Sequence, residues 1–154
     1  MPMLIAIIMV LLSSELFAQK KIDYTQLRGK EWVMQLPDKM GMFIVYTYGI
    51  DSCTTVAKYS TDSAKLQYIY YLSDEWNGTF DDTKVGVWGG GKYLIKKQKF
   101  EKRKLIMIRV YEILKLTETD LELRSVESIE LTEEGEELDR CEYDIINKYK
   151  SKQE

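Results

Sequence analysis

The sequence contains no histidine, only two cysteines, and no dominant sign of charge. Without histidine the chain cannot form a Ser-His or Cys-His catalytic pair, a histidine-ligated zinc site or a histidine-ligated haem. Carboxylate, lysine or tyrosine chemistry remains open to it, as does the absence of any catalysis.

The charge balance also excludes one class of partner. The 154 residues carry 22 Lys and Arg against 25 Asp and Glu, a formal net charge of −3. Such a balance provides no electrostatic attraction to nucleic acid or to anionic lipid. We therefore expect no nucleic-acid partner, and any other partner is held by shape and apolar contact.

The chain opens with an apolar run over residues 3–12, followed by two serines and a short segment that ends at Ala18. This run is too short to cross a bilayer, but it has the length of a secretory signal core, although no Lys or Arg precedes it. We predict a signal peptide over 1–18, a single domain over 19–154, no transmembrane anchor, and export to the periplasm or the extracellular space. The alternative is a buried N-terminal strand or helix.

Export makes the two cysteines a candidate disulfide. Cys53 and Cys141 lie far apart in the sequence, and closing so long a loop would restrict the unfolded chain by about 4–5 kcal/mol. The other interpretation is two separate buried thiols, because sequence does not give the distance between them.

The pattern of apolar residues predicts an all-β protein. Several segments rich in Tyr, Ile, Val and Leu show period-two alternation, and none shows a sustained helical stripe. Consecutive strands joined by short turns form an antiparallel meander, and closing it into a barrel of about eight to ten strands removes the exposed edges. The predicted strands are Lys30–Leu36, Met42–Tyr48, Leu66–Leu72, Lys92–Gln98, Leu105–Leu116, Asp120–Val126 and Cys141–Tyr149.

Glycines mark the turns. Asn77-Gly78 is a strong hairpin signal because both central residues of that turn need positive φ. The stretch GVWGGGKY over 86–93 matches a phosphate-binding loop except for Tyr93 in the last position. A phosphate loop must open a helix, whereas a β-type run follows Lys92. We therefore interpret the three glycines as a bend that leads into a strand.

The sequence contains two groups of acidic residues, of which the first could bind a metal ion and the second is expected to be surface charge. Asp74, Glu75, Asp81 and Asp82 surround the Asn-Gly turn, but they lack the spacing of a calcium loop, so solvated charges are favoured and no metal or cofactor is predicted. An acidic loop that keeps the surface soluble is expected over residues 130–139. Its acidic residues are Glu130, Glu133, Glu134, Glu136, Glu137 and Asp139.

The remaining motifs lie at the start of the first predicted strand and over residues 70–123. LRGKEW over 27–32 looks like the entry to a lipocalin-type barrel, with Gly29 before a buried Trp32, although two residues separate them where the lipocalin signature has one. Later segments, YYLSDEWNGTFDDTKVG, GGGKYLI and YEILKLTETDLEL, are similar to the bacterial lipocalin-like domains of small exported proteins. In those domains a Phe-Asp…Lys-Val-Gly segment precedes a Gly-Lys-Tyr strand and a closing hairpin. The resemblance implies a ligand-binding or structural barrel rather than an enzyme. It also implies a basic residue across the tryptophan, for which Arg140 is the nearest candidate.

The expected ligand is a small apolar or amphipathic molecule inside the barrel, because tyrosine offers an apolar body with a polar end. We predict that Met34, Tyr46, Tyr68 and Tyr70 line its cavity, although core packing would also explain the tyrosines. The alternative is a cell-envelope module that binds a protein or glycan through its loops, with Trp76 and Trp88 as anchors. A carboxylate enzyme is a third option, for which no spacing provides support.

Overall fold

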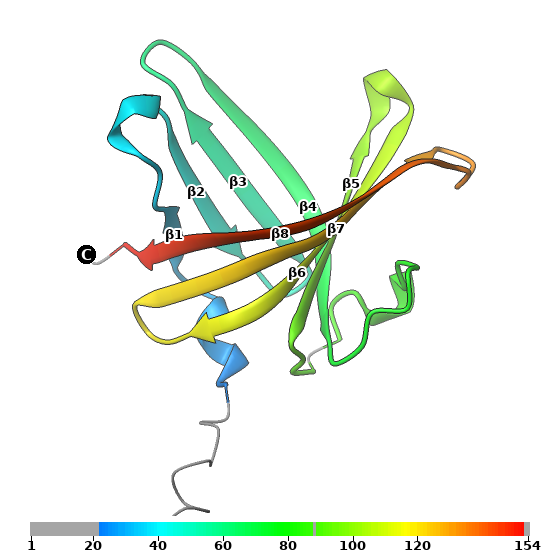
Figure 1. Cartoon of the computed structure of the whole chain (residues 1–154), viewed down its shortest axis with the longest axis horizontal. Coiled ribbons are helices and arrows are strands. Elements are labelled where there is room, and N and C mark those ends of the chain that lie inside the picture. Colours follow the sequence, from blue (N-terminus) through cyan, green and yellow to red (C-terminus); the bar gives the residue numbers. More distant parts are fainter. Residues whose placement is uncertain (1–21, 88, 153–154) are drawn as a thin grey trace, which may run out of the picture.

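The computed structural model describes residues 22–87 and 89–152, and it forms a closed barrel of eight antiparallel strands in chain order (Figure 1). The predicted all-β meander is thereby confirmed. The predicted signal peptide and Trp88 lie outside the described residues. Within the described part of the chain, no helix has the length and apolar character needed to span a membrane.

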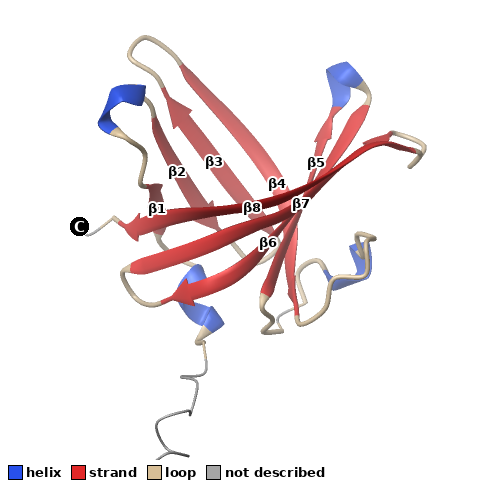
Figure 2. Cartoon of the chain, in the orientation of Figure 1, coloured by secondary structure: helices blue, strands red, loops and turns tan. Residues whose placement is uncertain are grey.

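Each strand pairs with the next, and the last returns to the first, where Trp32 faces Ser151 and Met34 faces Tyr149. Only short 3-10 helices interrupt the strands (Figure 2). The strands are β1 Glu31–Met34, β2 Phe43–Tyr48, β3 Ser52–Lys58, β4 Ser63–Ser73, β5 Tyr93–Phe100, β6 Leu105–Leu116, β7 Asp120–Thr132 and β8 Glu137–Ser151, and the 3-10 helices are η1 Tyr24–Leu27, η2 Asp38–Met40, η3 Asp82–Lys84 and η4 Glu101–Arg103.

Two apolar clusters stabilise this wall, one on each side of it. The outer cluster lies under the long β4–β5 connection, where Phe80 contacts Tyr71 edge to face with 5.0 Å between ring centroids. The inner cluster fills one end of the barrel and includes Trp32, Tyr48 and Tyr149. That end is closed to solvent, because all three side chains are buried.

Helix η1 plugs the closed end. Leu27 at its end is fully buried, and its carbonyl accepts a hydrogen bond of 2.9 Å from the indole N–H of Trp32. The cation over the Trp32 ring is Lys30, with its Nζ 5.4 Å from the ring centroid. The expectation for Arg140 is therefore wrong: that residue binds Glu127 and Glu137 on the outer face.

The opposite end of the barrel is open, because β1 is short. β1 pairs with β8 only over the last residues of β8, Tyr149–Ser151. Ahead of them, Ile145 and Ile146 are 55% and 52% exposed. Figure 1 shows the β7–β8 hairpin extending away from β2 and β3 on this side, and we call this end of the barrel the mouth.

Two of the three glycines before Lys92, Gly90 and Gly91, allow a close approach between segments. A Cβ at Gly91 would lie 2.2 Å from the backbone carbonyl carbon of Ser73, and one at Gly90 would lie 2.7 Å from the Tyr24 ring. Strand β5 begins at Tyr93 directly afterwards. The glycines therefore pack the β4–β5 connection against its neighbours, and the structure lacks the helix that a phosphate loop requires.

Three local predictions need correction. β3, Ser52–Lys58, was not predicted. The expected acidic loop is mostly strand, because β7 extends to Thr132 and β8 begins at Glu137. Asn77-Gly78 forms a turn in which the Asn77 side chain accepts from the Thr79 amide, but it lies inside the long β4–β5 connection and joins no hairpin.

The predicted disulfide is wrong as well, since both cysteines are free thiols in this structure. Cys53 is buried in the closed-end cluster together with Tyr149. Cys141 precedes Tyr149 on the extended strand β8 by about eight residues, or roughly 26 Å at the rise of a strand. A disulfide needs Cα atoms within about 7 Å of each other.

Candidate functional site

A buried lysine lies at the centre of the barrel. Lys96, on the inner face of β5, is only 2% exposed. Its Nζ lies close to the rings of four tyrosines, which come from three other strands. The distances from Nζ to the ring centroids are 4.6 Å for Tyr46, 5.0 Å for Tyr48, 5.5 Å for Tyr68 and 5.1 Å for Tyr111. We call these four residues the tyrosine cage.

A second cation stands beside it. Arg109 on β6 is the register partner of Lys96, so the two side chains start from directly opposed positions on the inner face. Such opposed side chains have Cβ atoms about 5 Å apart, and like charges there are destabilising. The Arg109 Nε donates to the Met107 sulfur at 3.1 Å, which directs the guanidinium along the inner face of β6.

Neither cation has a counterion in the described structure. The ion pairs among residues 22–87 and 89–152 join other lysines and arginines to carboxylates, and none includes Lys96 or Arg109. Three polar atoms on the same inner face are also buried without a hydrogen-bond partner: Tyr48 Oη, Thr55 Oγ1 and Gln98 Oε1. Buried polar groups are normally paired, so this cluster is unusual.

A cavity of about 340 Å³ lies against β6, β7 and β8 next to this region. Arg109 and Tyr111 belong to its lining, so the cavity reaches the tyrosine cage at Tyr111, whereas Lys96 and the other three cage tyrosines do not line it. Glu130 is the acidic residue of the lining that lacks an ion pair in the described structure, and its register partner is Met107. The lining residues are Met107, Arg109, Val110, Tyr111, Ser125, Glu127, Ser128, Glu130, Tyr143, Ile145 and Asn147.

The four predicted ligand-binding residues occupy different levels of the interior. Tyr46 and Tyr68 both belong to the cage, and Met34 is partly buried against the closed-end cluster. Tyr70 lies at the closed end of the barrel, where its hydroxyl donates a hydrogen bond to the Gly49 carbonyl at 2.5 Å and accepts one from Arg28 Nε at 3.2 Å. The structure therefore brings two of the four together around the central lysine.

Burial keeps three of the cage tyrosines neutral. It raises the pKa of Tyr46, Tyr48 and Tyr68 above the ordinary phenol value, because an isolated phenolate would lose its hydration. Tyr149, which packs edge to face on Tyr46 at 5.4 Å, has a raised pKa for the same reason. Tyr46, Tyr48 and Tyr68 thus face the ammonium as phenols that carry no negative charge at neutral pH.

Sequence reasoning missed both cations. The search for alternation followed apolar residues only, and in KYLIKKQKF the inward phase of β5 begins with Leu94 and continues with Lys96 and Gln98. The signal was the continuation of that phase into polar residues. Arg109 is likewise in phase with Met107 and Tyr111 on β6.

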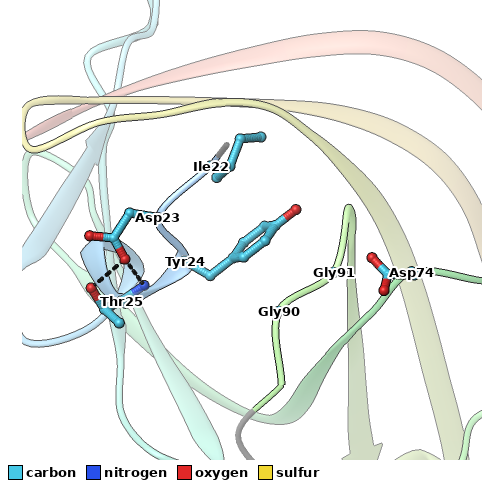
Figure 3. Close-up of a pocket in the computed structure, with 7 residues that line it drawn as sticks. All are labelled: Ile22, Asp23, Tyr24, Thr25, Asp74, Gly90 and Gly91. Carbon is cyan, nitrogen blue, oxygen red and sulfur yellow. Dashed lines mark hydrogen bonds between the residues drawn. The ribbon is translucent and has the colours of Figure 1, made fainter. Parts of the chain in front are cut away.

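A larger pocket, of about 650 Å³, lies outside the barrel between η1 and the glycine segment (Figure 3). Its wall contains Asp23 and Asp74, whereas Gly90 and Gly91 contribute no side chains. Asp23 already acts as the N-cap of η1, since its carboxylate accepts hydrogen bonds from both the amide and the hydroxyl of Thr25. This pocket therefore presents no described cation and no unpartnered buried group to a ligand.

The acidic residues of the β4–β5 connection have local roles. Asp81 caps η3 by accepting from Thr83, and Asp82 forms an ion pair with Lys97. No group of three or more Cys, Asp or Glu side chains within the described ranges is arranged to hold a metal ion.

Trp76 is engaged by the barrel wall. Its indole N–H donates to Glu127 at 2.6 Å, and its ring packs against the outer cluster. Arg140 binds the other oxygen of Glu127 at 2.8 Å. A tryptophan held in this way covers the wall, so it offers little to the alternative in which loop aromatics anchor a partner.

Comparison of the chain with protein-family models, with curated proteins and with solved structures returned no match.

Proposed function

We propose that this protein is an exported, non-enzymatic, lipocalin-like barrel that binds one small amphipathic molecule in the open half of its interior. One observation carries the proposal: the interior is divided into a packed half and an open half. The packed half holds Trp32 and its apolar neighbours. The open half holds the cavity of about 340 Å³, whose lining includes Arg109.

This division is typical of a ligand site and atypical of a structural core. Ligand pockets are largely apolar, contain a few convergent polar groups, and measure about 300–1,000 Å³. The cavity pairs apolar walls from Met107 and Ile145 with polar groups from Ser125 and Asn147. A molecule with one apolar and one polar end would satisfy both kinds of surface.

Native mass spectrometry of the gently purified protein tests the proposal. The expected result is a complex heavier than the chain by a few hundred daltons, which reverts to the chain mass on denaturation. Ser128→Phe, which fills the cavity, should abolish the added mass. Thr47→Phe, which changes an exposed position on β2, should retain it. A chain mass alone, together with no binding of amphipathic probes to refolded protein, would overturn the proposal.

A further inference from the structure

We infer that the ligand of this barrel carries an anionic head group, a carboxylate or phosphate, that binds Arg109 with the charge of Lys96 behind it. The inference rests on the proposed function and specifies the chemistry of the same site. It is drawn from the charges of the inner face, which the described structure leaves uncompensated.

The first step is the placement of the two cations. Lys96 and Arg109 are directly opposed on neighbouring strands, and neither forms an ion pair with a described carboxylate. A buried charge is normally paired, because removing it from water is costly. An anion bound to Arg109 would reduce the mutual repulsion of the two cations and supply the missing partner.

The second step is the cage. Its phenols hold the Lys96 ammonium through their ring faces, and such cation–π contacts leave the net positive charge in place. The Tyr48 hydroxyl has no partner in the described structure. The cage therefore fixes a positive charge and also carries an unused hydroxyl beside it.

The third step is the direction of the cavity. Arg109 and Tyr111 are partly buried members of the lining, whereas Ile145 and Tyr143 are 55% and 43% exposed. An anionic head would lie inward, and an apolar tail would lie toward the mouth. Glu130 lies two residues beyond the register partner of Arg109 along β7, and its carboxylate would repel a second negative charge on the tail.

Isothermal titration calorimetry with four ten-carbon probes tests this inference: decanoate, decyl phosphate, decanol and decyltrimethylammonium. The wild-type protein, first refolded from denaturant, should bind decanoate or decyl phosphate at least tenfold more tightly than decanol. The cationic probe should bind most weakly. The better of the two anions identifies the head group as carboxylate or phosphate.

Variants locate the effect. Arg109→Met should lower the affinity for the better anion at least tenfold, and Lys96→Met should lower it by about threefold to tenfold, with decanol affinity unchanged in both. Lys99→Met, on an exposed lysine of the same strand, is the matched control and should bind like wild type. If Lys96→Met misfolds, Lys96→Gln and the salt dependence of wild-type binding provide the same information.

The outcomes separate the two proposals. If decanol binds as tightly as the anions, or if the cationic probe binds best, the inference is overturned while the proposed function stands. If Arg109→Met binds the anions like wild type, the assigned site is wrong. If none of the four probes binds, the proposed function fails together with the inference.

Discussion

Replacing Lys96 by methionine should stabilise the ligand-free protein. The side chain is 2% exposed and has no carboxylate partner in the described structure, so its charge opposes folding. Methionine keeps an unbranched apolar stem of similar length and removes the charge. The expected result is a free energy of unfolding about 1–3 kcal/mol higher than that of wild type.

This magnitude is the balance of three contributions. Burying the ammonium costs several kcal/mol after relaxation, roughly 4. Repulsion from Arg109 adds about 2 kcal/mol at an effective dielectric constant of 20 and a separation of roughly 7 Å. Four cation–π contacts that share one ammonium return about 3–4 kcal/mol. Removing all three leaves a net gain of about 2–3 kcal/mol.

Urea unfolding monitored by tryptophan fluorescence measures the change. Lys99→Met is the control, because Lys99 is 57% exposed and pairs with Glu133 at 3.1 Å. Its effect should stay within about 0.5 kcal/mol. If Lys96→Met instead lowers the free energy of unfolding by 1 kcal/mol or more, the cage more than compensates the charge, and the reasoning about an unsatisfied interior is refuted.

Three further predictions concern the glycines, the thiols and acid stability. Gly91→Ala should destabilise the fold by about 2–4 kcal/mol in urea unfolding, because its Cβ would meet the backbone of β4. Gly89→Ala, with open space around it, should change stability by less than about 0.5 kcal/mol. Equal effects of the two substitutions would contradict the packing argument. A thiol reagent should modify Cys141 in the native protein and Cys53 only after unfolding. The reaction of Cys141 should quicken at alkaline pH, because a hydrogen bond to a neighbouring aspartate raises the Cys141 pKa. An intact mass two hydrogens below that of the reduced chain would contradict both expectations. Hydrogen bonds from a lysine and a threonine lower the pKa of Asp120 to about 2. The ionised carboxylate therefore stabilises the fold above a pH of about 4, and this contribution is lost as the pH falls toward 2. The melting temperature of Asp120→Asn should depend less on pH across that range than that of wild type, and equal dependence would exclude the contribution.

The barrel could be predicted from the sequence wherever the inward residues are apolar. Leu66, Tyr68 and Tyr70 of β4 alternate clearly, and that strand was found. β3 was missed because its inward residues are small or polar: Cys53, Thr55 and Ala57. In addition, the outer part of the β7–β8 hairpin extends beyond the barrel body, so its pairing decides its structure and no buried face marks it in the sequence.

The site could be predicted only in part, because its polar members break the pattern that located the strands. Tyr46 and Tyr68 were found through their aromatic character, but nothing local distinguishes Lys96 from Lys97, which follows it and lies half-buried on the outer face. Their opposite roles depend on the phase of β5, which is set by Leu94 and by pairing with β4 and β6. One residue of register separates a caged lysine from a surface ion pair.

The division of the interior explains how the chain tolerates two unpaired cations. The closed-end cluster buries Trp32, Leu121 and Leu123 completely, and it supplies apolar burial independent of the open half. If Lys96 and Arg109 served only to fill the barrel, apolar residues at these positions would be favoured, since a packed apolar interior is at least as stable as one that contains an unpaired charge. Natural proteins break such local rules mainly at functional sites. Lys96 and Arg109 break the rule together, at opposed positions and beside a cavity, so the interior of this barrel is better explained by a negative partner than by the needs of folding.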